Sequence, residues 1–354
     1  MDILDQLEQM KKIDTSGMLE TVQSLEQQSR HAWENTRLLK VPKSYRKAQR
    51  VAVFGMGGSA LGAHVVKTLF ADQLSATFEI INDYTIPTWI DKETFVILSS
   101  YSGTTEETVT VAEQIHNKTD KVAVIATGGR LQQLAQKNNW PAYIIDPKFN
   151  LSGQPRMAVG YSVVGQIGLL ERAGLLTVSD TEMEKACAAI AHCTAALTPD
   201  QENAAKEIAR AVKGKIPLFI GSDFLAGNMH TFSNQINESA KNFSTYFLIP
   251  ELNHHLLEGL ENPKELISKF VMIFFPSQYY HSRVEMRYEI TREVAEKNGL
   301  GTYTYHPHGE SRIEQSFEIL TLGGHAAFYL AMLSGINPTP IPWVDYFKDQ
   351  LEKK

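Results

Sequence analysis

The segment SSYSGTTEET, residues 99–108, gathers serine and threonine around one glycine directly after the apolar run FVIL. Hydroxyl side chains can donate hydrogen bonds to phosphate oxygens, and a helix that begins near Thr105 would add free backbone N–H groups and a partial positive charge. We interpret this segment as a phosphate-binding turn. The alternative is an ordinary capped helix, because Ser or Thr shortly before Glu is typical of a capping box.

A second turn, GMGGSALG, occupies residues 55–62 and follows the apolar run VAVF. Its glycines would let the backbone approach a ligand closely. The spacing Gly55-x-Gly57-x-x-Ala60 also satisfies a loose dinucleotide-binding pattern, with Asp83 where a ribose-binding acid would lie. Two neighbouring strand ends that both offer small donors fit one compact phosphate, so we favour a phosphate site. An NAD-dependent dehydrogenase is the alternative.

These turns need a scaffold, and the sequence predicts an α/β fold with parallel sheets covered by helices on both faces. Apolar, β-branched runs alternate with helical patterns at residues 51–54, 78–81, 95–98, 121–127 and 142–145. The pattern starts again at residues 216–222, 246–250, 269–276 and 301–306. The two halves also begin alike, with VAVFGMGGSALGAH and PLFIGSDFLAGNMH, which indicates a weak internal repeat.

The same pattern divides the chain into four segments. A helical segment (1–40) precedes a first subdomain (41–152). Linking helices (153–212) then lead to a second subdomain with a C-terminal tail (213–354). A chain of 354 residues is long enough for two domains of ordinary size.

Composition excludes several classes of protein. The 34 basic and 40 acidic side chains give a net charge of −6, which disfavours a nucleic-acid partner. The two cysteines, Cys187 and Cys193, form neither a disulfide framework nor a metal motif, and no metal is expected. The first residues do not resemble a signal peptide, and the longest uninterrupted apolar runs are far shorter than a membrane span. We expect a cytoplasmic protein without a membrane partner.

Taken in order, several motifs resemble one family. GMGGSALG, SYSGTTEET, ATGG and QPRMAVGYS are followed by QINESAKN, PELNHH and the tail GINPTPIPWVDYFK. Together they are similar to the SIS (sugar isomerase) domain, and specifically to the bifunctional phosphoglucose/phosphomannose isomerases, from about residue 40 onward. The resemblance implies two doubly wound SIS-type subdomains, no cofactor, and the interconversion of glucose 6-phosphate, mannose 6-phosphate and fructose 6-phosphate.

The resemblance also implies roles for individual residues. The substrate phosphate would be held by Ser100, Ser102 and Thr105, beside Gly57, Gly58 and Ser59. Arg156 would face the reacting carbons, Glu238 would be the catalytic base, His254 would open the sugar ring, and Lys348 would be its partner. In the family the histidine enters from the neighbouring subunit, which implies a homodimer with its active site at the subunit interface.

These residue types suit the chemistry. An aldose becomes a ketose when one base removes a proton from carbon and returns it to the adjacent carbon, through a cis-enediol that an arginine can stabilise. Each residue also has an ordinary alternative, because most helix glutamates, loop arginines and terminal lysines are solvated. A non-catalytic sugar-phosphate regulator would keep the phosphate turn and would not need Glu238, Arg156 and His254 together.

Overall fold

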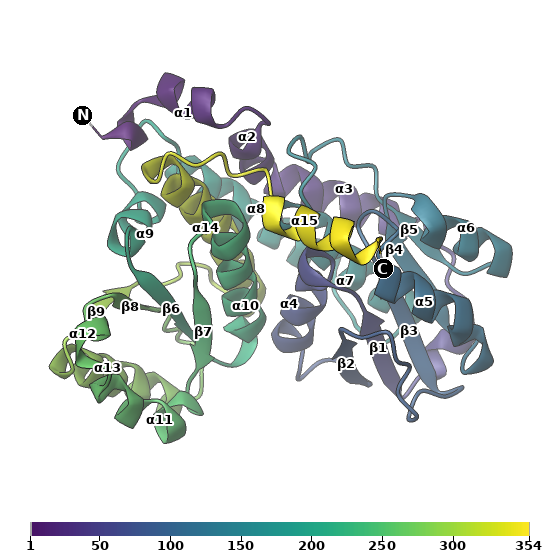
Figure 1. Ribbon diagram of the computed structural model, residues 1–354. Helices are drawn as coiled ribbons and strands as arrows, with labels where there is room; N and C mark the ends of the chain where they lie inside the picture. Colours follow the sequence, from purple (N-terminus) through teal and green to yellow (C-terminus); the bar gives the residue numbers. More distant parts are fainter. Residues whose placement is uncertain (1, 354) are drawn as a thin grey trace.

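The computed structural model describes residues 2–353 and contains two separate parallel sheets (Figure 1). The first sheet comprises β1 (Arg50–Phe54), β2 (Thr77–Ile81), β3 (Thr94–Ser99), β4 (Val122–Ala126) and β5 (Ala142–Ile144). The second sheet comprises β6 (Ile216–Gly221), β7 (Thr245–Leu248), β8 (Phe270–Phe274) and β9 (Gly301–Thr304). Each expected apolar run became a strand, so the predicted α/β fold is confirmed.

Both sheets use the same strand order. The first is β2-β1-β3-β4-β5 and the second is β7-β6-β8-β9, with every neighbouring pair parallel. In this flavodoxin-like order the chain runs from β1 to one side and then to the other. The loops after β1 and β3 therefore lie side by side at a topological switch point, where ligands bind in open α/β sheets. The order differs from the 3-2-1-4-5-6 arrangement of a classical dinucleotide fold.

The central strands of the first sheet, β1, β3 and β4, are buried on both faces. Val53 and Ile97 belong to one apolar cluster, whereas Phe54 and Leu98 belong to another. The first face is covered by α4 (Leu61–Leu69) and α7 (Val159–Ala173), and the second by α5 (Glu106–Gln114) and α6 (Gly129–Asn138). Such burial explains why these strands read as nearly continuous apolar runs.

The second sheet is flanked by α9 (Ala204–Val212), α10 (Ala226–Gln235), α13 (Ser282–Lys297) and α14 (Arg312–Leu333). By length and hydropathy, α14 could cross a membrane. The sequence-based expectation did not include this, because it considered only uninterrupted apolar runs. However, 94% of its most apolar window is buried inside the protein, as in the core helix of a globular domain.

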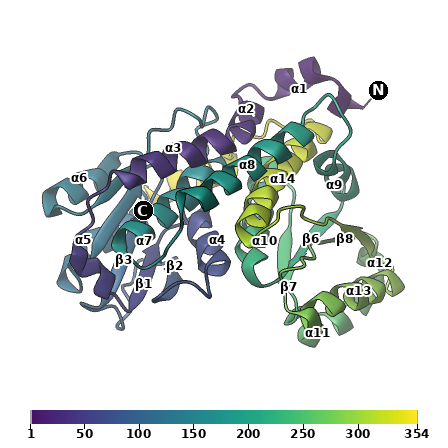
Figure 2. The ribbon, with the colours of Figure 1, turned by 180° about the vertical axis from the view of Figure 1, so that it is seen from behind.

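Helices at the back join the two sheets (Figure 2). There α3 (Leu25–Arg37) packs on α7, and α8 (Asp180–Ala196) packs on α14. The N-terminal helices α1 (Leu7–Ile13) and α2 (Met18–Gln23) lie near α14, and Asp5 forms an ion pair of 3.3 Å with the buried Lys206 of α9. One continuous apolar cluster extends through both halves.

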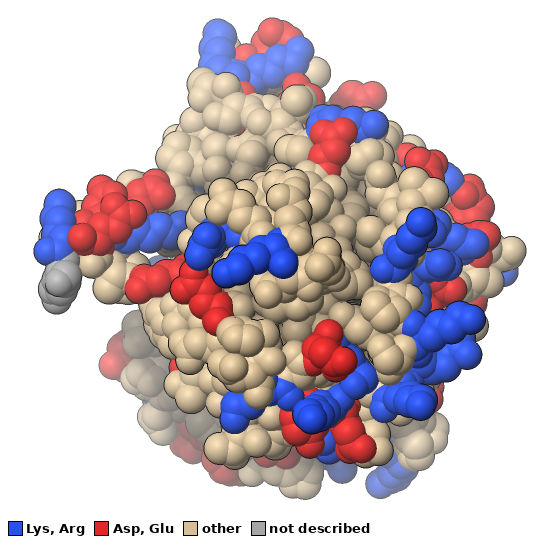
Figure 3. All heavy atoms as spheres, turned by 90° about the vertical axis from the view of Figure 1, so that its right-hand side faces the viewer, with Lys and Arg blue, Asp and Glu red and all other residues tan. Residues whose placement is uncertain are grey.

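The remaining elements are short, except for the last helix. They are α11 (Leu252–His255), α12 (Lys264–Ile267), the π-helical turn η7 (Ile236–Ala240), and the 3₁₀ turns η1 (Ile3–Asp5), η2 (Lys43–Lys47), η3 (Gly57–Ser59), η4 (Ile115–Asn117), η5 (Pro155–Met157), η6 (Asp223–Leu225) and η8 (Leu257–Glu261). The last helix, α15 (Pro342–Leu351), has no buried residue. It runs from the second half toward the first, and its charged end projects from the body of the molecule (Figures 1 and 3).

The helices that follow the first strand of each sheet, α4 and α10, pack directly on each other. Gly227 makes this approach possible, because an added Cβ would lie 2.1 Å from the backbone oxygen of His64. His64 and His230, the last residues of the two repeated motifs, lie there with tilted rings whose centroids are 4.0 Å apart. Burial, together with the neighbouring His230, lowers the pKa of His64 to about 4, so this contact is uncharged at neutral pH.

We expect Gly227→Ala to lower the free energy of unfolding by about 2 kcal/mol, because the added methyl group must push two packed helix backbones apart. Gly259→Ala is the matched control, since an added Cβ there meets no atom within 4 Å. Urea unfolding of both variants measures the difference. Equal stability of the two variants would contradict the close packing of α4 on α10.

Candidate active site

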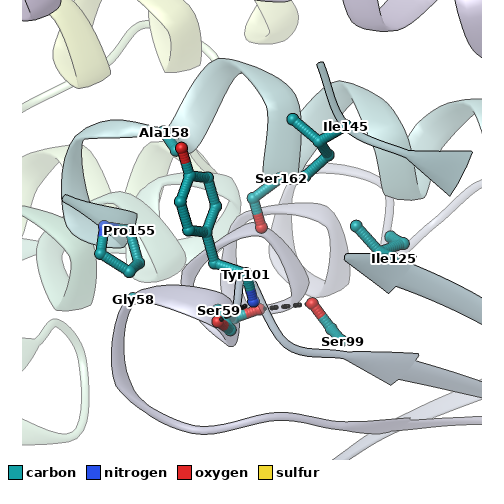
Figure 4. A pocket seen from close by; sticks show the side chains of 9 residues that line it. All are labelled: Gly58, Ser59, Ser99, Tyr101, Ile125, Ile145, Pro155, Ala158 and Ser162. Carbon is teal, nitrogen blue, oxygen red and sulfur yellow. Dashed lines mark hydrogen bonds between the residues drawn. The ribbon is translucent and has the colours of Figure 1, made fainter. Parts of the chain in front are cut away.

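The two sequence-predicted turns are bonded to each other at the carboxyl ends of β1 and β3. Ser59 accepts a hydrogen bond at Oγ from the backbone N–H of Tyr101 (2.9 Å), and its carbonyl accepts one from Ser99 Oγ (2.8 Å) (Figure 4). Gly55 allows this approach, because an added Cβ would lie 2.9 Å from the Ser99 carbonyl oxygen. Gly57, Gly58 and Ser59 are thus held beside the serine-rich turn.

Within the serine-rich turn, Ser100 is fully buried and organises the loop. Its Oγ accepts from the backbone N–H groups of Gly103 (3.1 Å) and Thr105 (3.4 Å) and lies 2.7 Å from Thr105 Oγ1. Thr105 occupies the N-cap position of α5, yet its side chain makes no capping hydrogen bond. The capped-helix alternative therefore does not describe this turn. Ser102 is exposed at its tip.

A small cavity lies behind these turns (Figure 4). It is lined by Gly58, Ser59, Ser99, Tyr101, Ile125, Ile145, Pro155, Ala158 and Ser162. The space open to the centre of a water molecule is about 10 Å³, which suffices for roughly one water. A sugar does not fit there, so this cavity is not a binding site for one.

Arg156, on η5, has a side chain with no exposed surface, and all its N–H donors are used. Nε donates to Ser239 Oγ (2.9 Å), and Nη1 donates to Gln154 Oε1 (2.7 Å) and Glu238 Oε2 (3.3 Å). Nη2 donates to the carbonyl oxygens of Pro338 (2.7 Å) and Thr339 (2.9 Å). Burial lowers the pKa of Arg156, and the Glu238 carboxylate opposes that shift. Whether Arg156 faces a sugar stays a prediction.

Glu238 lies on the π-helical turn η7, which continues α10. The sequence indicates an ordinary amphipathic helix here, whereas π-helical turns occur frequently at functional sites. The carboxylate faces Arg156, and the side chain keeps 26% of its surface exposed. It is therefore a paired carboxylate that solvent or a ligand can still reach.

Direct contacts connect this carboxylate with the glycine turn. An added Cβ on Gly58 would lie 2.7 Å from the backbone nitrogen of Arg156, so the glycine turn touches η5. Gln235 of α10 donates from Nε2 to the Arg156 carbonyl oxygen (3.1 Å) on the other side. The length of one arginine side chain thus separates the predicted phosphate site of the first half from Glu238 of the second.

The structure does not bring His254 to this group within one chain. Asn237 Oδ1 accepts from Ser244 N (2.7 Å), which fixes η7 beside the amino end of β7. His254 is exposed on α11, which follows the carboxyl end of β7. A strand of four residues spans roughly 10–13 Å, so the two side chains lie at opposite ends of the second sheet.

Lys348 is exposed on the projecting helix α15, away from the body of its own half. The family resemblance predicts that Lys348 acts together with His254. Among the described residues of one chain, the two side chains make no contact. Within residues 2–353, no three His, Cys, Asp or Glu side chains gather as they would around a metal ion.

Sequence reasoning missed four participants in the site. Gln154 and Ser239 bind the Arg156 guanidinium, Lys241 lies three residues after Glu238, and the segment 336–341 covers the arginine. Gln154 lies in the motif QPRM and Lys241 in the motif NESAK. Their polar side chains, close in sequence to Arg156 and Glu238, were the feature from which they could have been predicted. Nothing in the tail sequence indicates that its carbonyl oxygens bind Arg156.

Two family models match the chain. The SIS domain model covers residues 44–155, and the model of the bacterial phospho-glucose isomerase C-terminal SIS domain covers residues 201–351. A bifunctional phosphoglucose/phosphomannose isomerase from Caldicellulosiruptor bescii is 28% identical over 94% of this chain and 98% of its own length. The protein of the same name from Aquifex aeolicus is 28% identical over 91% of this chain and 94% of its own length.

The fold comparison agrees with the sequence comparison. A solved structure of a hypothetical protein from Thermus thermophilus superposes with a TM-score of 0.74, at 18% identity, over 98% of this chain and 94% of that chain. Fold and site together define an SIS-domain protein of the sugar-isomerase class. Both models describe SIS domains, and over most of its length the chain is similar to the bifunctional phosphoglucose/phosphomannose isomerases.

We expect Ser100→Ala to lower the free energy of unfolding by about 1–2 kcal/mol, because it removes a buried acceptor from two backbone N–H groups of the turn. Ser102→Ala serves as the control, since its hydroxyl is exposed and should change the free energy by less than about 0.5 kcal/mol. Urea unfolding of both variants tests this difference. Equal effects would mean that Ser100 does not organise the turn.

Proposed function

We propose that this protein is an enzyme that reversibly isomerises hexose 6-phosphates, converting glucose 6-phosphate and mannose 6-phosphate to fructose 6-phosphate. The observation that carries the proposal is the partly exposed Glu238 carboxylate, paired with an Arg156 whose backbone packs on the glycine turn beside the serine-rich turn. The names of the matched relatives support the same substrates. The chemistry needs no cofactor, because the proton that leaves one carbon returns to its neighbour.

In the proposed reaction, the phosphate binds at Ser102 and Thr105 on the turn that the buried Ser100 organises, beside Gly57, Gly58 and Ser59. His254 helps to open the sugar ring by moving a proton between the anomeric hydroxyl and the ring oxygen. Glu238 then removes the proton on C2 of the open aldose while O1 gains a proton, which gives a cis-enediol. The O2 hydroxyl then loses its proton as Glu238 delivers the carbon-bound proton to C1 to give the ketose. Rotation of the enediol about C2–C3 would let the same carboxylate serve both C2 epimers.

The Arg156 cation contributes through its charge. The enediol intermediate carries negative charge as it forms, and a buried guanidinium that is already oriented by Gln154 and Ser239 stabilises that charge without reorganising. All N–H donors of Arg156 are already used, so the guanidinium makes no hydrogen bond to the intermediate. Its positive charge stabilises the intermediate from the far side of the Glu238 carboxylate.

We further propose a homodimer whose active sites each combine residues of two subunits. The separation of Glu238 and His254 along β7 supports this, because a second copy must supply the histidine. The α15 surface supports it too, since Trp343, Tyr346 and Phe347 expose 81%, 59% and 65% of their surface. Exposed aromatic clusters are typical of subunit interfaces. A cytoplasmic location, and the lack of nucleic-acid and membrane partners, stay predictions from the sequence.

Glu238→Gln should abolish turnover, because the amide cannot accept the C2 proton, while fructose 6-phosphate should still raise the melting temperature. A coupled assay that reads glucose 6-phosphate and mannose 6-phosphate separately measures the rate. Glu34→Gln, at an exposed position on α3, controls for the loss of one charge. A variant that still turns over would remove the assignment of the base, and a wild-type protein that yields only one aldose would remove the bifunctional activity from the proposal.

Co-expression of Glu238→Gln and His254→Asn chains tests the shared site. In a hybrid dimer one site carries both substitutions and the other carries neither, so random pairing should restore roughly a quarter of the wild-type rate. Each variant alone should be inactive. Light scattering confirms the dimer, and a co-expressed mixture as inactive as its parents would place both residues in sites of a single chain.

A further inference from the structure

Lys241 has no assigned role, yet its side chain enters the centre of the site. The ammonium donates to the carbonyl oxygens of Glu238 (2.9 Å), Ser239 (3.3 Å) and Pro338 (2.9 Å), which uses all three of its donors. Lysine ordinarily keeps its ammonium in water and buries its stem. Here the residue is exposed as a whole, while its charged end is bound to carbonyl oxygens beside a buried arginine.

The Pro338 carbonyl is shared by both cations. It accepts from Arg156 Nη2 (2.7 Å) and from Lys241 Nζ (2.9 Å), and the adjacent Thr339 carbonyl accepts from Arg156 as well. Pro338 and Thr339 are both buried. They belong to the segment 336–341, which we call the strap, and this strap is the covalent connection between α14 and α15. The position of α15 therefore depends on the cations that flank Glu238.

We propose that Lys241 is a positioning residue of the isomerase: with Arg156 it fastens the strap beneath Glu238, and thereby holds the carboxylate and α15 in one fixed arrangement. The effect on catalysis rests on the proposed function, whereas the fastening of the strap by Lys241 does not. Lys241 binds the η7 backbone at Glu238 and Ser239, and it binds the strap at Pro338. We call this set of contacts the clamp. Removing the ammonium would release η7 and the strap from each other.

The backbone supports a specific use of this side chain. Lys241 ends η7 in the left-handed region, with φ of 52°, where glycine or asparagine is the usual residue. The cost of that conformation is the same for Lys, Arg and Met, since all three have an unbranched Cβ. Comparing these residues therefore isolates the ammonium and its charge.

The environment of the ammonium also makes its protonation observable. Removal from water and the nearby Arg156 lower the pKa of Lys241 to about 8, and Glu238 opposes this. Arg156 on η5 and Glu238 on η7 are the charged groups acting on it, and the strap contributes carbonyl oxygens. As the pH rises through about 8, the Lys241 ammonium loses its proton and its charge, so kcat should fall on the alkaline side.

Lys241→Met, Lys241→Arg and the exposed control Lys213→Met test the proposal in the full-length protein. The rate of hydrogen exchange at the strap amides measures how firmly the strap is held, and this measurement needs no substrate. We expect faster strap exchange in Lys241→Met, a roughly tenfold lower kcat for fructose 6-phosphate, and a KM within about twofold of wild type, since the phosphate turns are untouched. Lys213→Met should match wild type in each measurement.

Lys241→Arg should restore slow strap exchange and kcat, and should shift the alkaline limb upward because a guanidinium stays charged. Strap exchange equal in Lys241→Met and wild type would overturn the proposal. Exchange as fast in Lys241→Arg as in Lys241→Met would overturn it too, because the charge would then not be what holds the strap. A wild-type protein without isomerase activity would refute the proposed function, while the exchange comparison would still decide the fastening role.

Discussion

The buried guanidinium of Arg156 is the interaction on which the rest of the site depends. A charge without contact to water is tolerated only when it is paired and fully hydrogen-bonded. Its partners come from three separate stretches of chain, namely Gln154 beside it, Ser239 and Glu238 on η7, and the strap carbonyls of Pro338 and Thr339. No one of these stretches can move away without leaving an unsatisfied donor in the interior.

That constraint explains how a site can be built between two halves that each have their own sheet. The first half contributes the turns at the switch point between β1 and β3, and the second contributes a carboxylate at the end of α10. Gly58 packs on the Arg156 backbone, and the Arg156 side chain reaches Glu238. The arginine thus sets the distance between the place where a phosphate can bind and the group that can move a proton.

Much of this arrangement was predictable from the sequence, because it depends on local patterns. Each strand was found from an apolar run, and both turns from small residues that follow a strand directly. The hydrogen bond between the hydroxyls of Ser100 and Thr105 was not predictable. In a sequence, a hydroxyl that bonds to its own loop cannot be told from one that binds a ligand. The strap was not predictable either. Its contribution comes from backbone carbonyls, which every residue type provides.

The internal repeat allows the corresponding turns of the two sheets to be compared. In the second sheet, β6 and β8 occupy the positions of β1 and β3, so an equivalent pair of turns exists. There, however, the fully buried rings of Phe224 and Phe275, together with Tyr280, fill the strand ends, and Phe224 packs on Tyr280 with centroids 5.4 Å apart. The small hydroxyls that do follow these strands, Ser222 and Ser277, are buried and donate to the Ile249 carbonyl oxygen and to Gln315 Oε1. The contribution of the second unit instead comes from the far end of the helix that follows its first strand, where α10 continues as η7 and Glu238 pairs with Arg156 of η5.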